Sequence, residues 1–204
     1  MYCATANFVS QETETLLRLD TKLWFSPPLD PLSGICVGAV VGLNPGSSSP
    51  RAGEVGYAEV DSTMSKILAA FADAYAELGR ALPGNSYVRM WNLCYVREAD
   101  SRRLLSSLQD PKKLSALTSC SCLDKTESDH VPCLWFAWTA STPRALAIRS
   151  RRWWEHPKCP IAYLGPDGLP HVFNGESDLH AVRHPSRKSR QALATTVKFL
   201  LPQQ

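Results

Sequence analysis

The 204-residue sequence predicts an α/β protein: a three-layer α/β/α sandwich with a central, mainly parallel sheet of four strands. Two observations support this prediction. Short runs rich in Val, Ile and aromatic residues have the continuous hydrophobicity of strands that are buried on both faces. Segments with a helical spacing of apolar residues lie between these runs, and such alternation is typical of parallel sheets covered by helices.

The first of these strands is expected at residues 35–43, and a Pro-, Gly- and Ser-rich loop follows at residues 44–56. Asp61 or Ser62 can then cap a helix. The apolar residues of this helix recur at i, i+3 and i+4, so they predict a stripe that faces the core: Met64, Ile67, Leu68, Phe71, Tyr75 and Leu78.

The other elements follow in chain order. Strands are expected at residues 86–91, 131–138 and 160–164, with a short extended piece at residues 171–173. Thr142-Pro143 is expected to open a further helix, and a last helix follows His184-Pro185-Ser186. At the other end of the chain, an amphipathic stretch and a Pro-rich connector predict a helical extension over residues 1–33. A length of 204 residues and the lack of a second core predict a single domain over residues 1–204.

The composition is that of an ordinary soluble globular protein, with 44% hydrophobic and 20% charged residues. A formal net charge of +3 neither demands nor excludes nucleic acid as a partner. No apolar run approaches the ~18–20 residues of a membrane span, so we expect no membrane association. Two basic clusters in the C-terminal third are either a nucleic-acid contact or a solvated face: Arg144, Arg149, Arg151 and Arg152, and Arg183, Arg187, Lys188 and Arg190.

The seven cysteines follow no disulfide framework, and no secretory signal opens the chain. We therefore expect a reducing, cytoplasmic location, with nucleoid association in a bacterium or a nuclear site in a eukaryote. Cys120-Ser121-Cys122, with His130 and Cys133 after it, invites interpretation as a metal site. However, C-x-C is not the usual zinc spacing, so we expect no metal and no cofactor.

Three short motifs carry most of the functional information: Gly42-Leu43-Asn44-Pro45-Gly46, Asn92-Leu93-Cys94 and His184-Pro185-Ser186. The first two follow predicted strands, and the third precedes the last helix. Ligands of such sheets bind outside the carboxyl ends of the strands, where all three motifs are expected. Two asparagines and a histidine at this edge suit hydrolysis of the bond between a sugar and a base.

Each residue type has a chemical role and a simpler alternative. Asn44 can hold a water through its amide, or it can be a turn former; the phosphate-loop patterns GxxxxGK[ST] and GxGxxG are absent. The donor and acceptor of Asn92 can read a pyrimidine edge, or they can close a turn. His184 can donate a hydrogen bond to charge developing on a leaving base, or it can be an ordinary surface residue. Tyr57 and Tyr95 are candidate stacking surfaces.

At these motifs the sequence resembles the uracil-DNA glycosylase superfamily, most closely the single-strand-selective monofunctional and mismatch-specific branches. Their first motif, G-[ILM]-N-P-G, is matched by residues 42–46, and ten residues then separate Gly46 from Tyr57, at the place of an aromatic residue that stacks on the base. Asn92-Leu93-Cys94 matches a strand-end motif with a base-reading asparagine. His184-Pro185-Ser186 matches the motif that carries the histidine and begins a DNA-wedging loop.

The resemblance implies roles for individual residues. Asn44 and His184 would be catalytic, and Asn92, Tyr57 and Gly46 would recognise the base. DNA contacts would come from the first-motif loop and from the turn and helix start after the histidine: Ser47, Ser186, Arg187, Lys188 and Arg190.

The sequence departs from the family pattern at the first motif and at the wedge. The branch most strictly selective for uracil has aspartate and tyrosine around the first-motif proline, whereas Asn44 and Gly46 stand here. The tyrosine blocks 5-substituted pyrimidines, so its replacement by Gly46 implies that a bulkier base could enter. The wedge residues Arg187-Lys188-Ser189-Arg190 are also more basic than the usual continuation, which leaves the wedging step open.

We therefore expect a monofunctional DNA glycosylase that flips a uracil or a 5-modified pyrimidine out of DNA and leaves an abasic site. Lyase chemistry is not expected, because no motif places a lysine to attack the sugar. DNA is the expected partner, and a monomer the expected state. Three alternatives remain open: a glycosylase for hypermodified phage bases, such as glucosylated hydroxymethylcytosine, that acts in antiviral defence rather than DNA repair; a non-catalytic DNA-binding module; and a hydrolase of free nucleosides.

Overall fold

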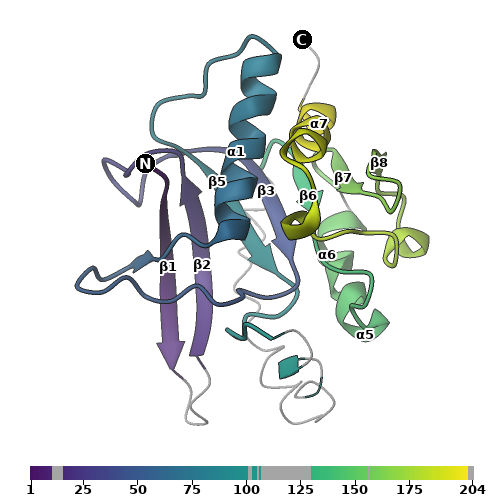
Figure 1. Ribbon diagram of the computed structural model, residues 1–204, viewed down its shortest axis with the longest axis horizontal. Helices are drawn as coiled ribbons and strands as arrows, with labels where there is room; N and C mark the ends of the chain where they lie inside the picture. Colours follow the sequence, from purple (N-terminus) through teal and green to yellow (C-terminus); the bar gives the residue numbers. More distant parts are fainter. Residues whose placement is uncertain (11–15, 101–102, 105, 107–129, 156, 202–204) are drawn as a thin grey trace.

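A computed structural model describes residues 1–10, 16–100, 103–104, 106, 130–155 and 157–201. It confirms the α/β class, and its described strands form one sheet of eight, in the order β4-β1-β2-β5-β3-β6-β7-β8 (Figure 1). The predicted sheet of four strands was therefore too small. The strands are β1 (Cys3–Ser10), β2 (Leu16–Trp24), β3 (Ile35–Gly42), β4 (Tyr57–Ala58), β5 (Ser86–Asn92), β6 (Leu134–Phe136), β7 (Ile161–Leu164) and β8 (Pro170–Val172).

The centre of the sheet is parallel and consists of β5, β3, β6 and β7 in that order. On β3, Val41 pairs with Trp91 of β5 and with Phe136 of β6, so the carboxyl ends of these strands lie level at one edge. β3 is buried from Val37 to Gly42. Burial on both faces explains the uninterrupted apolar run that predicted this strand.

The N-terminal segment is a β-hairpin, so the predicted helical extension over residues 1–33 is wrong. β1 and β2 pair antiparallel, and β2 also pairs antiparallel with β5, where Thr21 lies opposite Met90. Asp20 has a positive φ of 51° and interrupts the strict alternation of inward and outward side chains. This irregularity gives the apolar residues of β2 a spacing that resembles a helix, whereas pairing with β5 fixes the strand.

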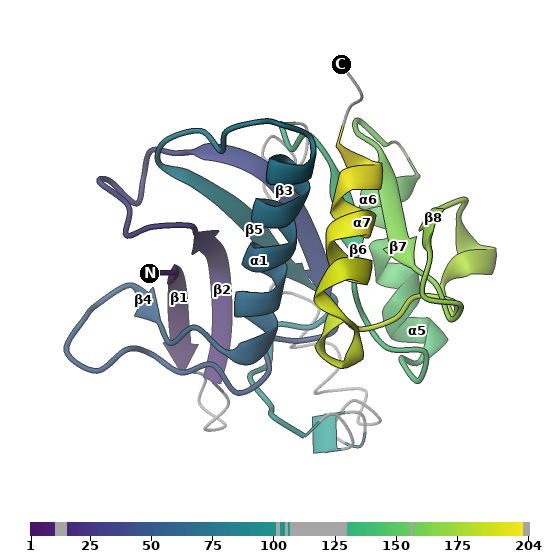
Figure 2. The same cartoon turned by 45° about the horizontal axis from the view of Figure 1, so that its top comes forward.

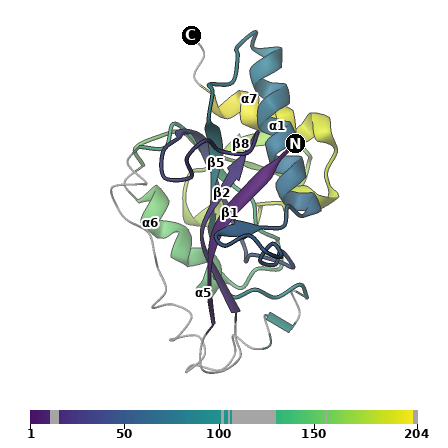
Figure 3. The same ribbon diagram turned by 90° about the vertical axis from the view of Figure 1, so that its left-hand side faces the viewer.

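Helices cover both faces of the sheet. On one face α1 (Ser62–Glu77) packs beside α7 (Arg190–Leu200), as Figure 2 shows. On the other face lie α5 (Arg144–Ala147), the 3-10 turn η1 (Ile148–Ser150) and α6 (Arg151–Trp154), as the edge-on view of Figure 3 shows. Further 3-10 turns are η2 (Glu176–Asp178) and η3 (Pro185–Arg187).

The predicted stripe of α1 faces the core. Met64, Ile67, Leu68 and Phe71 are buried, and the side chain of Asp61 caps the helix by accepting a hydrogen bond of 2.8 Å from the backbone N–H of Met64. These α1 residues belong to a hydrophobic cluster on one face of the sheet, which also includes Val40 of β3 and Met90 of β5. The next residues of these strands, Val41 and Trp91, belong to a second cluster on the opposite face, together with Trp153. No helix among the described residues has the length and hydrophobicity to cross a membrane.

Candidate functional site

Asn92 is the last residue of β5 and the register partner of Gly42, the last residue of β3. The Asn92 side chain is fully buried, and neither its Oδ1 nor its Nδ2 has a hydrogen-bond partner among the described residues. A Cβ on Gly42 would lie 3.1 Å from this Oδ1, so the asparagine approaches the glycine closely. Buried polar groups nearly always have partners, so this amide, at the carboxyl edge of a parallel sheet where ligands bind, is a candidate for contact with a ligand.

Asn44 lies just beyond β3, and its side chain has a defined orientation. Its Nδ2 donates to the carbonyl oxygens of Glu98, at 2.7 Å, and Val96, at 3.4 Å. Both donor hydrogens of the amide are thereby engaged with the segment that follows β5. The remaining polar atom, Oδ1, is an acceptor with no donor among the described residues, and such an atom can orient a water molecule.

The loop that carries Asn44 is braced by Arg97 and by β4. Arg97 donates from Nε to the carbonyl of Ser48, at 2.8 Å, and from Nη2 to that of Ser47, at 2.7 Å. The Ser48 hydroxyl donates to the carbonyl of Glu59, at 2.7 Å. Arg97 is a positioning residue that the sequence motifs did not identify, because it acts through backbone carbonyls far from it in sequence.

His184 stands at the start of η3 in an extended conformation, and its ring has a defined acceptor atom. The backbone N–H of Ser186 donates to Nδ1 at 3.2 Å, and the Ser186 hydroxyl lies 2.8 Å from the same nitrogen. A backbone N–H can only donate, so Nδ1 accepts, and the neutral ring carries its proton on Nε2. The Nε2–H of His184 is therefore a hydrogen-bond donor that points away from Ser186.

The turn around His184 is joined to the same edge of the sheet. The backbone N–H of Arg183 donates to the carbonyl of Leu164, the last residue of β7, at 3.0 Å. η3 packs against α1, where Lys66 donates to the carbonyl of Ser186 at 2.5 Å. The structure thus brings Asn44, Asn92 and His184 from three distant segments to the carboxyl ends of β3, β5 and β7.

Gly46 and Tyr57 lie in the loop and strand that lead to α1. Gly46 has a positive φ of 69°, and a Cβ there would have only Asp61 Oδ2 within 4 Å, at 3.9 Å. A side chain at Gly46 would therefore begin in free space. Tyr57 is half-buried on β4, whose next residue, Ala58, bridges to Pro50 of the same loop. β1 and β2 separate β4 from β5 in the sheet order, so the stacking role of Tyr57 stays a prediction.

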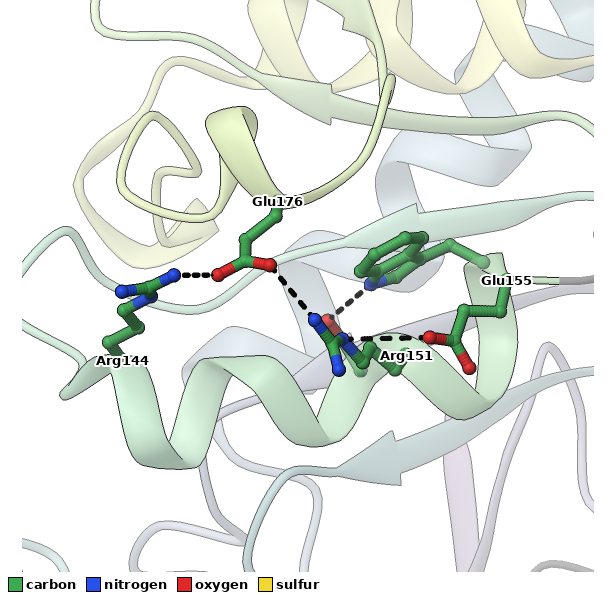
Figure 4. A network of polar contacts seen from close by, with 6 residues as sticks. Arg144, Arg151, Glu155 and Glu176 are labelled. Atoms are coloured by element: carbon green, nitrogen blue, oxygen red, sulfur yellow. Dashed lines mark hydrogen bonds and ion pairs between the residues drawn. The ribbon is translucent and has the colours of Figure 1, made fainter.

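The first basic cluster is largely committed to contacts within the protein. Arg144 and Arg151 both bind the carboxylate of Glu176, and Arg151 also pairs with Glu155 (Figure 4). Burial lowers the pKa of Arg149 and lowers that of Arg152 to about 10. The Arg152 guanidinium lies over the Trp153 ring at 4.3 Å. Arg144 and Arg151 are therefore engaged in ion pairs within the protein, whereas Arg149 Nη1 and Arg152 Nε and Nη2 are buried without a hydrogen-bond partner among the described residues.

The second basic cluster has a mixed character. Arg190 forms a bidentate ion pair with Asp73 that joins α7 to α1, and this pair lowers the pKa of Asp73. Arg183 donates to the carbonyl oxygens of His180, Ala181 and Val182. Lys188 is half-buried and has no acceptor among the described residues, and Ser47 is exposed. Lys188 and Ser47 are thus better placed than Arg190 to contact a partner.

Arg18 on β2 is a buried polar residue that lies outside the three sequence motifs. It is fully buried, and its Nε and Nη1 have no hydrogen-bond partner among the residues that the structure describes. The predicted helical extension over residues 1–33 hid it, because an amphipathic surface helix would place this arginine in solvent. In the strand, the extra residue at Asp20 shifts the alternation and places Arg18 on the same face as Thr21, where its Nη2 contacts the sulfur of Met90.

The interpretation of the cysteine-rich segment as a metal site falls partly outside the described residues, since these exclude Cys120 and Cys122. Cys133 lies buried in the core, and burial raises the pKa of its thiol. Within the part of the chain that the structure describes, no group of three or more His, Cys, Asp or Glu side chains could hold a metal ion.

Comparisons with known protein families, with curated proteins and with solved structures find no match to this chain.

Proposed function

We propose that this protein is a monofunctional DNA glycosylase that hydrolyses the N-glycosidic bond of uracil or of a 5-modified pyrimidine. The observation that carries the proposal is the Asn92 amide, which is fully buried at the sheet edge and whose two polar atoms have no hydrogen-bond partner in the described part of the chain. Uracil offers an acceptor at O4 and a donor at N3, and one amide side chain complements both. A flipped base is read through such an edge.

His184 and Asn44 supply the two catalytic functions. As the bond between C1′ and the base breaks, negative charge develops on the base, and the Nε2–H of His184 donates a hydrogen bond to O2. One preorganised donor of this kind lowers a barrier by ~3–4 kcal/mol. Asn44 Oδ1 accepts a hydrogen bond from the water that adds to C1′. The water loses its proton, the departing base gains one, and the products are free base and an abasic site.

The proposed DNA contacts lie around the same edge. Ser47, Ser186 and Lys188 would bind phosphates. Arg190 is not among these contacts, because Asp73 already neutralises its guanidinium. Tyr57 would stack on the extruded base.

Base entry requires a conformational change, because Asn92 is inaccessible in the free protein. We expect the loop at residues 44–56 to move. It contains three glycines with positive φ, Gly46, Gly53 and Gly56, and residues of this kind absorb the dihedral changes of loop opening.

The free space around Gly46 favours a specific second candidate, a glycosylase for hypermodified pyrimidines. Glucosylated hydroxymethylcytosine in phage DNA is one such base, and its removal would serve antiviral defence instead of repair. Cytosine-type bases leave less readily as anions, so His184 would then have to donate a proton fully.

A base-release screen tests the proposal. Oligonucleotides that carry uracil, thymine mismatches, hydroxymethylcytosine or its glucosylated form are incubated with the wild-type protein and with Asn92→Ala. Asn174→Ala, a change of an exposed asparagine, is the matched control. We expect free base and an abasic site from at least one DNA, loss of that product in Asn92→Ala, and normal release by the control. Tight DNA binding without release from any substrate would instead indicate a non-catalytic DNA-binding module, and release from nucleosides alone a nucleoside hydrolase.

A further inference from the structure

Among the described residues, no contact compensates the charge of Arg18. Its side chain is fully excluded from solvent, and within the described part of the chain only Nη2 has a polar contact, to the sulfur of Met90 at 3.8 Å. Nε and Nη1 are buried without a hydrogen-bond partner in that same part of the chain. No carboxylate among the described residues lies within ion-pairing distance of this guanidinium.

The position of Arg18 relates it to the base-reading asparagine. Met90, which Arg18 contacts, precedes Asn92 by two residues on β5, so both side chains emerge on the same face of the sheet. Met90 and Asn92 also converge on Gly42: a Cβ there would lie 3.7 Å from Met90 Cε and 3.1 Å from Asn92 Oδ1. Arg18 is therefore one side chain removed from the Asn92 amide.

The surroundings of Arg18 keep it charged but do not neutralise it. Burial lowers its pKa to about 10, so the guanidinium is still protonated at neutral pH. The Asp61 carboxylate raises this pKa, and the positive charge of Arg97 lowers it. Asp61 also caps α1 and lies nearest to Gly46, so the groups that influence Arg18 belong to the same site. A buried, unpaired charge is unfavourable, and a ligand with acceptor oxygens would remove this penalty.

We propose that Arg18 is a specificity-determining residue that binds an anionic or oxygen-rich substituent at C5 of the extruded pyrimidine, a carboxyl group being the simplest example. This inference rests on the proposed glycosylase function. His184 would bind O2 and Asn92 would bind O4 and N3, so C5 carries the remaining substituent that could reach a donor. DNA phosphates are excluded as the ligand, because they stay at the protein surface whereas Arg18 is fully buried.

Binding of the free bases tests the role of Arg18 without requiring catalysis. Calorimetry compares 5-carboxyuracil with uracil for the wild-type protein and for Arg18→Met. We expect the carboxylated base to bind the wild-type protein at least about tenfold more tightly, because a charge-assisted hydrogen bond has this strength. Arg18→Met should abolish the difference. Its melting temperature should not fall, since methionine replaces an unpaired buried charge with an apolar side chain of similar length.

Arg89→Met is the matched control. Arg89 is also a buried arginine of the sheet, but it forms an ion pair of 2.5 Å with Asp20. This variant should retain the preference for the carboxylated base. Equal binding of both bases by the wild-type protein, or an undiminished preference in Arg18→Met, would overturn the inference.

Base release distinguishes this inference from the proposed function. Release of uracil from DNA by the wild-type protein, without any Arg18-dependent preference for 5-carboxyuracil, would overturn only the role of Arg18. Arg18-dependent binding of 5-carboxyuracil without release from any DNA would support the role of Arg18 as a ligand-binding residue and overturn the glycosylase function.

Discussion

Gly42 and Asn92 face one another across the last pair of residues that joins β3 to β5, and a Cβ on Gly42 would lie 3.1 Å from Asn92 Oδ1. Gly42→Ala should therefore displace the amide by a few tenths of an ångström. We expect base release to fall about tenfold, because small misplacements of a positioning group reduce rates strongly. Steady-state kinetics measure this effect. An alanine variant with wild-type kcat/KM would show that the close approach has no functional role.

Asn92→Leu should separate stability from activity. An amide that is buried without partners costs ~1–3 kcal/mol, so leucine, with a similar volume, should raise the free energy of unfolding by a similar amount. Base release should disappear at the same time. Denaturant unfolding and the base-release assay on one preparation provide both values. A loss of stability in Asn92→Leu would indicate that the asparagine is structural.

His184→Ala should reduce kcat by about 10²–10³, with little change in KM, because the histidine acts on charge that develops only in the transition state. His171→Ala is the control. His171 pairs with Asp167 through Nε2 at 3.0 Å and stacks on Tyr163 at the edge of the sheet. The control should retain wild-type kcat, and an equal loss in both variants would argue against a specific role for His184.

Gly46→Tyr should change which base is accepted. The residue has free space around it but a φ of 69°, so a tyrosine fits at a cost of roughly 1–2 kcal/mol in stability. We expect release of a 5-substituted pyrimidine to fall much more than release of uracil. The ratio of kcat/KM for the two DNAs measures this selectivity, and an unchanged ratio would remove Gly46 from substrate discrimination.

The ion pair between Asp73 and Arg190 should contribute to stability only above acid pH. Arg190 lowers the pKa of the Asp73 carboxyl in the folded protein, whereas the unfolded value is about 3.9. The contribution is therefore fully present above about pH 4 and is lost as the pH falls through the lowered pKa. Arg190→Gln should have a lower melting temperature than the wild type at pH 7, and the difference should shrink as the pH falls below about 4 and the Asp73 carboxylate becomes protonated. A difference that persists in acid would contradict this explanation.

The parallel centre of the fold was predictable because its strands are buried on both faces. The run at residues 35–43 corresponds to β3, and the stripe of Met64, Ile67, Leu68 and Phe71 corresponds to α1. The antiparallel strands were not predictable to the same extent. The positive φ of Asp20 interrupts the alternation of buried and exposed side chains along β2. β4 has only two residues, which is too short for such an alternation to be recognised.

The sequence also located part of the candidate site. The motifs of Asn44 and Asn92 come at the ends of predicted strands, and His184 precedes the last helix. Glycine or proline next to Asn44 and His184 indicates a turn at these two positions. Arg18 and Arg97 could not be found in this way, because their roles depend on pairing between β2 and β5 and on contacts with distant carbonyls. The ion pair of Arg190 with Asp73 was likewise invisible, since it joins residues 117 positions apart.

Quantification of the free base released from oligonucleotides that carry a single uracil or a single 5-modified pyrimidine tests the proposed glycosylase function most directly. Wild-type protein and Asn44→Ala are compared under single-turnover conditions, with Asn174→Ala as a control for purity and handling. We predict free base and abasic DNA from at least one oligonucleotide with the wild type and with the control, and a rate at least about 100-fold lower with Asn44→Ala. Wild-type rates in Asn44→Ala would contradict the proposed mechanism, and no release of uracil or of any 5-modified pyrimidine by the wild type would contradict the glycosylase function itself.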